Sequence, residues 1–137
     1  MLKRILSFIG LVALMVLMTG VLTAAAPVPV PTFTLKQGLP AIMNVGDIAT
    51  VVVQVDSDQP FIFAQALPAA FFPGRGVVAA QGDHAGQGTS ATLSVPFYAK
   101  TSTSGFNGPA LVSVSVGVRY AGGYVVVERY EFQVQVP

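Results

Sequence analysis

The sequence predicts an all-β fold: an antiparallel two-sheet sandwich of about seven strands, preceded by a hydrophobic N-terminal helix. Three observations support this prediction. An uncharged apolar run follows a basic tip at the N-terminus. From residue 32 onward, apolar and polar residues alternate, as they do on the two faces of a β-strand. Clusters of Gly, Pro, Asp and Ser interrupt this alternation every 8–12 residues or so, about the spacing of turns in a β-sandwich.

The N-terminal segment has the three parts of an export signal. Lys3 and Arg4 form a basic tip, residues 5–22 are apolar, and residues 23–26 are small. Cleavage after Ala25 avoids a proline at the new N-terminus. The apolar run would extend about 27 Å as a helix, close to the thickness of a bilayer core, so a retained signal-anchor is the alternative. In both cases we expect the rest of the chain to be extracellular, periplasmic or on the cell surface.

The chain therefore divides into a leader and one domain. Residues 1–25 are the signal peptide or signal-anchor, residues 26–32 a proline-rich spacer, and residues 33–137 the sandwich. The prolines of the spacer fix φ and favour an extended chain. The domain is long enough for a hydrophobic core, and without cysteine it must fold without a disulfide.

Charged residues are scarce, at 9% of the chain against about 25% in an average soluble domain. Without Lys3 and Arg4 the chain has five basic and six acidic residues. This balance argues against nucleic-acid binding and leaves the N-terminal segment, if uncleaved, as the only expected membrane contact. Low surface charge gives little protection against association. Composition leaves two interpretations open, a solvated Ser/Thr/Gln surface or a surface that packs against a protein partner or another copy.

The first half of the domain predicts short strands separated by turn residues. Residues 32–36 form a first strand that continues over residues 41–45 after a kink at Gly38 and Pro40. A turn at residues 44–47 precedes a Val- and Thr-rich strand. The remaining segments are a strand at 48–55, a loop at 56–60, a strand at 61–66, a loop at 68–76, a strand at 76–81 and a glycine-rich turn at 82–89.

The second half predicts a strand and a long hairpin. Residues 90–99 alternate well, and Pro96 places this strand at an edge or a bulge because proline cannot donate to a ladder. Residues 110–119 and 124–136 form the hairpin, with Gly122 and Gly123 in its turn.

These elements resemble bacterial immunoglobulin-like extracellular modules. The likeness rests on the turn Val45-Gly46-Asp47 before residues 49–53, the edge segment 91–95 and the terminal Val/Tyr hairpin. It covers most of residues 33–137, and it implies export and a scaffold or binding role. The Cys–Trp–Cys hallmark of antibody-type domains is absent, because the chain has neither residue.

Few residues suggest chemistry. His84 follows Asp83, but a single histidine without cysteine does not complete a usual zinc site, and no Gly-x-Ser-x-Gly motif is present. Asp56 and Asp58, with Asp47 and Asp83, could form a calcium site at one end of the sandwich, although turn chemistry explains them equally well. We therefore assign no catalytic, cofactor-binding or metal-binding residue.

The only two glutamates of the chain do not form a catalytic carboxylate pair of the kind that glycosidases use. Glu128 and Glu131 lie three residues apart on a strand and should point to opposite faces. Arg129 and Glu131 share a face and should form a surface ion pair.

The candidate interaction site is the loop that carries Phe71, Phe72 and Arg75, because paired aromatic residues with an arginine are typical of interaction hot spots. The alternative is a loop that folds back over one end of the sandwich. The sequence therefore predicts a non-enzymatic exported structural or interaction module of the cell envelope or a surface assembly. The alternative is a soluble extracytoplasmic domain that binds a ligand or calcium.

Overall fold

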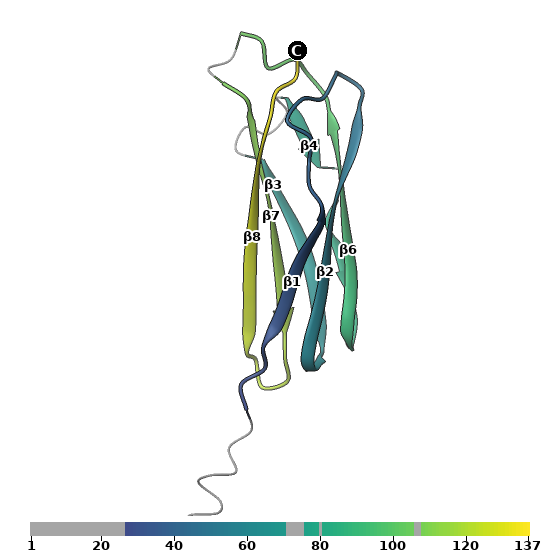
Figure 1. Cartoon of the computed structure of the whole chain (residues 1–137), viewed down its shortest axis with the longest axis vertical. Coiled ribbons are helices and arrows are strands. Elements are labelled where there is room, and N and C mark those ends of the chain that lie inside the picture. Colours follow the sequence, from purple (N-terminus) through teal and green to yellow (C-terminus); the bar gives the residue numbers. More distant parts are fainter. Residues whose placement is uncertain (1–26, 71–75, 80, 106–107) are drawn as a thin grey trace, which may run out of the picture.

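The computed structural model describes residues 27–70, 76–79, 81–105 and 108–137. In these residues, two four-stranded sheets pack face to face (Figure 1), and every strand pair within them is antiparallel. The strands are β1 (Pro31–Gln37), β2 (Ile48–Phe61), β3 (Phe63–Ala70), β4 (Val77–Ala79), β5 (Asp83–Ala85), β6 (Gly88–Ala99), β7 (Ala110–Arg119) and β8 (Val125–Val134). The all-β sandwich is confirmed, with eight described strands where the sequence predicted about seven; the predicted N-terminal helix lies outside the described residues.

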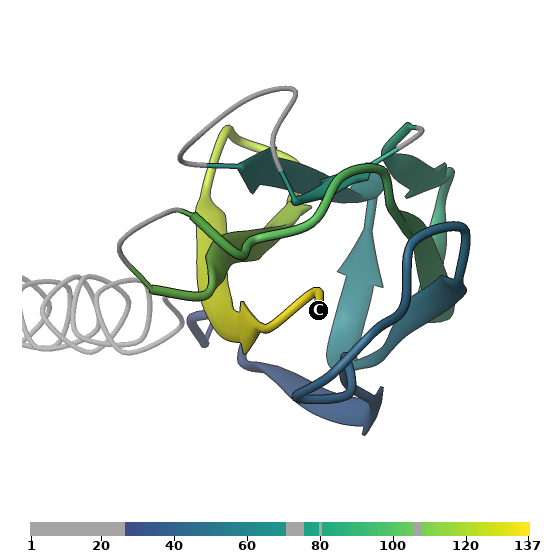
Figure 2. The same ribbon diagram turned by 90° about the horizontal axis from the view of Figure 1, so that it is seen from above.

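The strand order is that of an immunoglobulin-like sandwich. One sheet has the order β1-β2-β6-β4 and the other β5-β3-β7-β8, and Figure 2 shows the two layers from above. In immunoglobulin nomenclature the long strands β1, β2 and β6 take the places of A, B and E, and β3, β7 and β8 those of C, F and G. The short strands β4 and β5 complete the outer edges.

Alternating side chains build the core as the sequence predicted. The inward residues of β2, β6 and β7 are almost fully buried. They are Val51, Val53, Val55, Leu93, Val95, Phe97, Val112, Val114, Val116 and Val118. Each strand has one apolar inward face and one more polar outward face, so stacking the two sheets removes the apolar faces from water.

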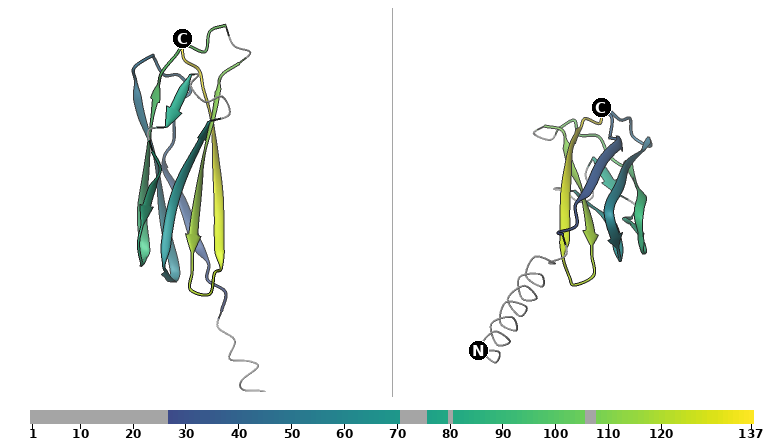
Figure 3. Two further views of the ribbon diagram at one scale, coloured as in Figure 1. Left: turned by 180° about the vertical axis from the view of Figure 1, so that it is seen from behind. Right: turned by 60° about the horizontal axis from the view of Figure 1, so that its bottom comes forward.

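The β7–β8 hairpin forms as predicted. Ten consecutive residue pairs join the two strands without a register shift. Gly122 and Gly123 both have φ of 88° in the turn, a conformation that glycine adopts without steric cost. The backbone N–H of Tyr120 donates to the carbonyl oxygen of Tyr124 at 2.8 Å and closes the turn. Figure 3 shows this hairpin turn at the end of the sandwich opposite the C-terminus.

The first strand changes sheets after its kink. β1 pairs with β2, but Ile42 forms a parallel bridge with Gln135, beyond the end of β8 in the other sheet. Met43 N–H donates to the Gln135 carbonyl at 3.0 Å, and Gln135 N–H donates to the Ala41 carbonyl at 2.8 Å. Of the predicted continuation at residues 41–45, only Ile42 forms a β-bridge, and no strand is present there. These bonds nevertheless tie the two sheets together.

Two segments that were predicted as loops belong partly to strands. β2 extends through residues 56–60 to Phe61, with an irregularity in its pairing with β6 between Asp56 and Phe61. β3 continues through residues 68–70, which pair with β7. The loop prediction was wrong at Asp56, Ser57 and residues 68–70 because a neighbouring strand pairs with residues whose side chains favour turns.

The proline-rich segment contacts the sandwich. The backbone N–H of Val30 donates to Asp58 Oδ1 at 2.9 Å, and Gln59 Nε2 donates to the Pro27 carbonyl at 2.9 Å. β1 begins at Pro31, inside the range predicted as spacer. The described end of the spacer therefore lies along the far half of β2.

Candidate functional site

The predicted interaction loop with Phe71, Phe72 and Arg75 lies outside the described residues. Gly76, which follows it, is held firmly. The Gly76 N–H donates to Thr101 Oγ1 at 2.8 Å, and its carbonyl accepts the Lys100 N–H at 2.7 Å. Its φ is +67°, and an added Cβ would lie 2.9 Å from the Cβ of Ala110. Gly76 therefore fixes the chain where β4 begins.

His84 lies on β5 and is exposed. Its ring stacks on Phe63 of β3, with 5.9 Å between the centroids. Asp83 does not orient this ring, because its Oδ1 atom accepts the backbone N–H of His84 at 2.9 Å. The glycine-rich segment around His84, predicted as a turn, instead contains a short strand that pairs with β3. The contacts of His84 are therefore structural.

Asp83 also protects the edge of β6. Its Oδ2 atom accepts the backbone N–H of Ser94 at 2.8 Å, and thus joins β5 of one sheet to β6 of the other. Among the described residues, β4 pairs with residues 97–99 of β6, and this described pairing ends at Phe97. The sheet order places β6 between β2 and β4, so β6 as a whole is not the edge strand that Pro96 suggested, and Asp83 bonds the backbone of β6 at Ser94, beyond the described pairs with β4.

The four aspartates considered for calcium do not come together. Asp47 precedes β2, whereas Asp56 and Asp58 lie in its far half, about 30 Å away along an extended strand. Asp47 Oδ2 accepts the Asn44 N–H at 2.8 Å within its own turn, and Asp58 accepts the Val30 N–H. Among the described residues, no three His, Cys, Asp or Glu side chains are grouped as metal ligands would be.

Asp56 takes part in a polar network on the outer face of the β1-β2-β6-β4 sheet. Gln54 Nε2 donates to Ser90 Oγ at 2.8 Å, and Ser90 Oγ donates to Asp56 Oδ1 at 3.0 Å. Thr92 Oγ1 donates to Gln54 Oε1 at 2.5 Å. These bonds join β2 and β6 on the face predicted to be polar.

The two glutamates lie on opposite faces of β8, as predicted. Glu131 points outward and its Oε1 lies 3.4 Å from the Nη2 atom of Arg129, which confirms the predicted surface ion pair. Glu128 shares the inward side with Tyr130. Burial, with a smaller contribution from the Glu128 charge, raises the pKa of Tyr130.

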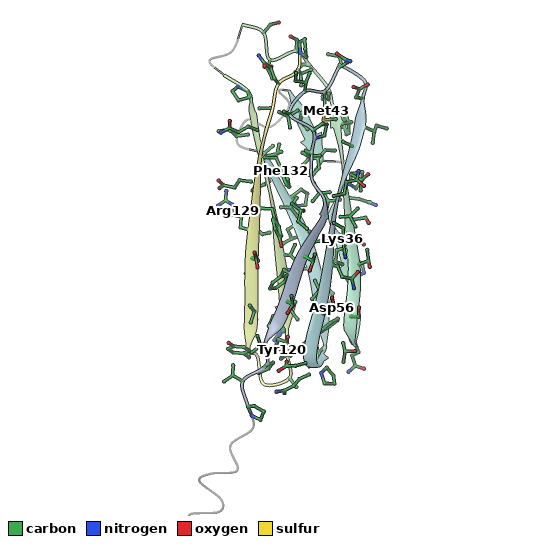
Figure 4. The ribbon with its side chains drawn as sticks, viewed as in Figure 1. Lys36, Met43, Asp56, Tyr120, Arg129 and Phe132 are labelled. Carbon is green, nitrogen blue, oxygen red and sulfur yellow. The ribbon has the colours of Figure 1, made fainter. Side chains whose placement is uncertain are left out.

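A contact that sequence reasoning missed joins the two sheets. The Tyr120 hydroxyl and Ser57 Oγ lie 2.6 Å apart. Ser57 belongs to β2, and Tyr120 follows β7 in the other sheet. Figure 4 shows Tyr120 near the hairpin end of the sandwich and Met43 near the opposite end. The only sequence signal was a serine in a segment that looked like a loop.

Exposed apolar side chains gather at the start of β8. Val125 and Val127 are 50% and 61% exposed, beside Tyr124 at 46%. Val127 lies opposite Gly117 of β7, and an added Cβ on Gly117 would lie 3.7 Å from Val127 Cγ2. Because β8 is the last strand of its sheet, these valines stand beside a strand edge.

A groove of about 290 Å³ lies at the C-terminal end, between Thr103, Pro109 and Pro137. The buried hydroxyl of Thr103 accepts the Val136 N–H at 2.9 Å and donates to the Val136 carbonyl at 3.0 Å. This hydroxyl therefore anchors the C-terminus. No helix among the described residues is long and apolar enough to cross a membrane.

Comparison with known proteins gives a likeness of fold. No protein-family model and no curated protein matches the chain. Native alpha-2-macroglobulin from Escherichia coli, in a crystal structure spanning domain MG7 to the C-terminus, is similar with a TM-score of 0.50 and 16% identity over 82% of this chain. A cryo-EM structure of the same protein gives a TM-score of 0.45 and 16% identity over 82% of this chain and 7% of that one.

The chain spans only 17% of the length of the crystallised macroglobulin fragment. At this level of identity the likeness concerns the sandwich fold alone.

Proposed function

We propose that the chain is a non-enzymatic exported module of the cell envelope or of a surface assembly, and that it acts through protein–protein contacts. The leader in residues 1–25 supports export. The fold supports a module, because a similar sandwich occurs as one part of a longer chain in the Escherichia coli macroglobulin structure.

The observation that carries this proposal is the exposed apolar surface at the start of β8. β8 is ten residues long, forms the last strand of its sheet and has exposed Val125 and Val127 beside its edge. Exposed apolar side chains on the last strand of a sheet favour association with another protein. The scarcity of charge in the chain removes one source of repulsion between surfaces.

The described polar candidates for chemistry have structural partners instead. Asp58 and Asp83 accept backbone N–H groups, and His84 stacks on Phe63. This arrangement favours a scaffold over an enzyme, since a catalytic acid or base needs to reach a substrate.

The experiment has two parts. Cell fractionation and the intact mass of the native protein should show an exported chain and reveal whether residues 1–25 remain. Chemical cross-linking before extraction should then capture the protein in a larger species. Val127→Lys should weaken that species without lowering the melting temperature, because Val127 is exposed. Thr34→Lys, an equal change on the exposed outer face of β1, should leave it intact. A cytoplasmic protein, or an exported one that is monomeric and never cross-linked, contradicts the proposal.

A further inference from the structure

We infer that the chain keeps residues 5–22 as a membrane anchor and rests the hairpin end of its sandwich on the outer surface of the lipid bilayer. This inference rests on the export that the proposed function includes, and it adds a lipid surface as a second contact. It follows from the place where the chain enters the sandwich, from the short connection to the apolar run and from the side chains at that end.

The chain enters the sandwich at the hairpin end. Gln59 Nε2 donates to the Pro27 carbonyl at 2.9 Å, and the backbone N–H of Val30 donates to Asp58 Oδ1 at 2.9 Å. β1 starts directly after this segment, and Figure 3 shows the described chain beginning beside the β7–β8 turn. The spacer is therefore held at two points, and the chain before Pro27 joins the domain at this end.

The connection between the apolar run and the sandwich is short. Residues 5–22 carry no charge, and only residues 23–26 separate them from Pro27. The five steps from Leu22 to Pro27 span at most about 18 Å. With residues 5–22 across the bilayer, the headgroup layer takes up about 5–8 Å of that length. The anchor therefore holds the hairpin end close to the lipid headgroups.

The hairpin end exposes apolar side chains to this surface. Val28 and Val30 are exposed in the spacer, and Ile62 is exposed at the turn from β2 to β3. Tyr124 is exposed beside the β7–β8 turn, where its ring lies 6.2 Å from that of Tyr120. Tyrosine favours the bilayer interface because its ring is apolar and its hydroxyl can stay in contact with water. These side chains suit an interface better than bulk water.

The same end has few charges to desolvate. It contains the ranges 27–31, 57–63 and 119–125. Asp58 and Arg119 are the only charged residues in these ranges, one acidic and one basic. The hairpin end can therefore approach the headgroups without burying a net charge.

The attachment of the chain, rather than exposure, selects this end. The opposite end also exposes apolar side chains, among them Val45 and Ile48. β2 has 14 residues between Ile48 at that end and Phe61 at the hairpin end, a length of roughly 40 Å. This is about twice the reach of the connection. Ile48 and Ile62 thus form a matched pair at the two ends of one strand.

Single tryptophans test the lipid contact, because the chain has no tryptophan of its own. Tyr124→Trp and the control Tyr98→Trp are each made in the full-length chain, expressed in an exporting host and reconstituted into phosphatidylcholine vesicles. Tyr98 is also exposed, and it pairs with Ile48 at the opposite end. When the lipid is brominated on acyl carbons near the headgroup, the tryptophan of Tyr124→Trp should lose most of its emission. That of Tyr98→Trp should keep its emission, since bromine quenches on contact.

Added charges test whether the apolar side chains make the contact. Ile62→Glu, combined with Tyr124→Trp, should reduce the quenching several-fold, because a carboxylate resists transfer out of water. Ile48→Glu, combined with Tyr124→Trp, should leave the quenching unchanged. Melting temperatures should show that each variant folds. Val28→Glu repeats the test in the spacer, outside the strands, if Ile62→Glu is destabilised.

Several results would overturn the inference. They are an intact mass that lacks residues 1–25, a lack of quenching in Tyr124→Trp, equal quenching in Tyr98→Trp, and quenching that ignores glutamate at both Ile62 and Val28. If the exported protein is still cross-linked to another protein in these cases, the lipid contact is wrong while the proposed function stands. If the lipid contact is found but no protein complex forms, the proposed protein–protein role is wrong instead. A protein that stays in the cytoplasm contradicts both.

Discussion

The Tyr120 hydroxyl and the Oγ atom of Ser57 lie 2.6 Å apart and join the two sheets at the hairpin end of the sandwich. Tyr120 is 2% exposed, so water has little access to the hydroxyl and could hardly replace this hydrogen bond if Ser57 were changed. The sheets are therefore connected at both ends, here by a side-chain bond and at the opposite end by the backbone bonds of Gln135.

We predict that Tyr120→Phe lowers the free energy of unfolding by about 1 kcal/mol, the typical net contribution of a hydrogen bond. The ring keeps its packing, so the loss reports the hydroxyl alone. Urea denaturation measures it. Ser57→Ala should cost a similar amount, and the double variant should cost less than the sum of both, because the two residues share one bond. Additive effects would mean that the bond does not form.

Gly76→Ala should be more destabilising than an ordinary surface substitution. Its φ of +67° disfavours any side chain, and the new Cβ would lie 2.9 Å from that of Ala110. Gly105→Ala is the matched control, because Gly105 also has a positive φ, of +90°, but open space around it. Thermal unfolding should show a loss of about 1 kcal/mol for Gly105→Ala, from backbone strain alone, and a larger loss for Gly76→Ala. Equal losses would contradict the close approach of Gly76 to Ala110.

Asp83→Ala should destabilise the β5 side of the sandwich by about 1–3 kcal/mol, because it removes the acceptor for two backbone N–H groups. Hydrogen exchange of the Ser94 amide should accelerate more than that of its neighbours. His84→Ala is the control, since the exposed ring provides only stacking. Unchanged Ser94 exchange in Asp83→Ala would contradict the role of Asp83 at the β6 edge.

Tyr130 should make folding sensitive to alkaline pH. Its pKa is raised by burial and, to a smaller extent, by Glu128, so the folded chain holds this proton more tightly than the unfolded chain. The resulting stability is fully present below the unfolded pKa of about 10 and is lost as pH rises through the higher folded pKa. Urea denaturation at neutral and alkaline pH should show a smaller alkaline loss in Tyr130→Phe than in the original chain. Glu128→Gln should lower the pKa of Tyr130 slightly in an ultraviolet titration; an identical alkaline loss in Tyr130→Phe would contradict the shift.

Local pattern predicted the strands whose own residues alternate. Side-chain direction and turn geometry are local properties. A few neighbouring residues were therefore enough to predict the inward valines of β2 and β7 and the glycine turn of the hairpin. The same pattern failed at residues 56–60, whose partners come from distant segments. The four aspartates show the same limit of local patterns. The sequence suggested that they could share one calcium ion, whereas in the structure each accepts hydrogen bonds from its own backbone or side-chain partner.

The sequence by itself determined a charge-poor chain whose strands each have one apolar and one polar face, because hydrophobic spacing decides which side of each strand is buried. Only the tertiary structure decided that residues 41–43 bond to the second sheet, that Asp83 bonds to the backbone of β6 and that β8 is the last strand of its sheet. These features depend on which strands become neighbours. The packing of the whole core decides which strands far apart in the sequence become neighbours, so no local pattern of residues predicts them.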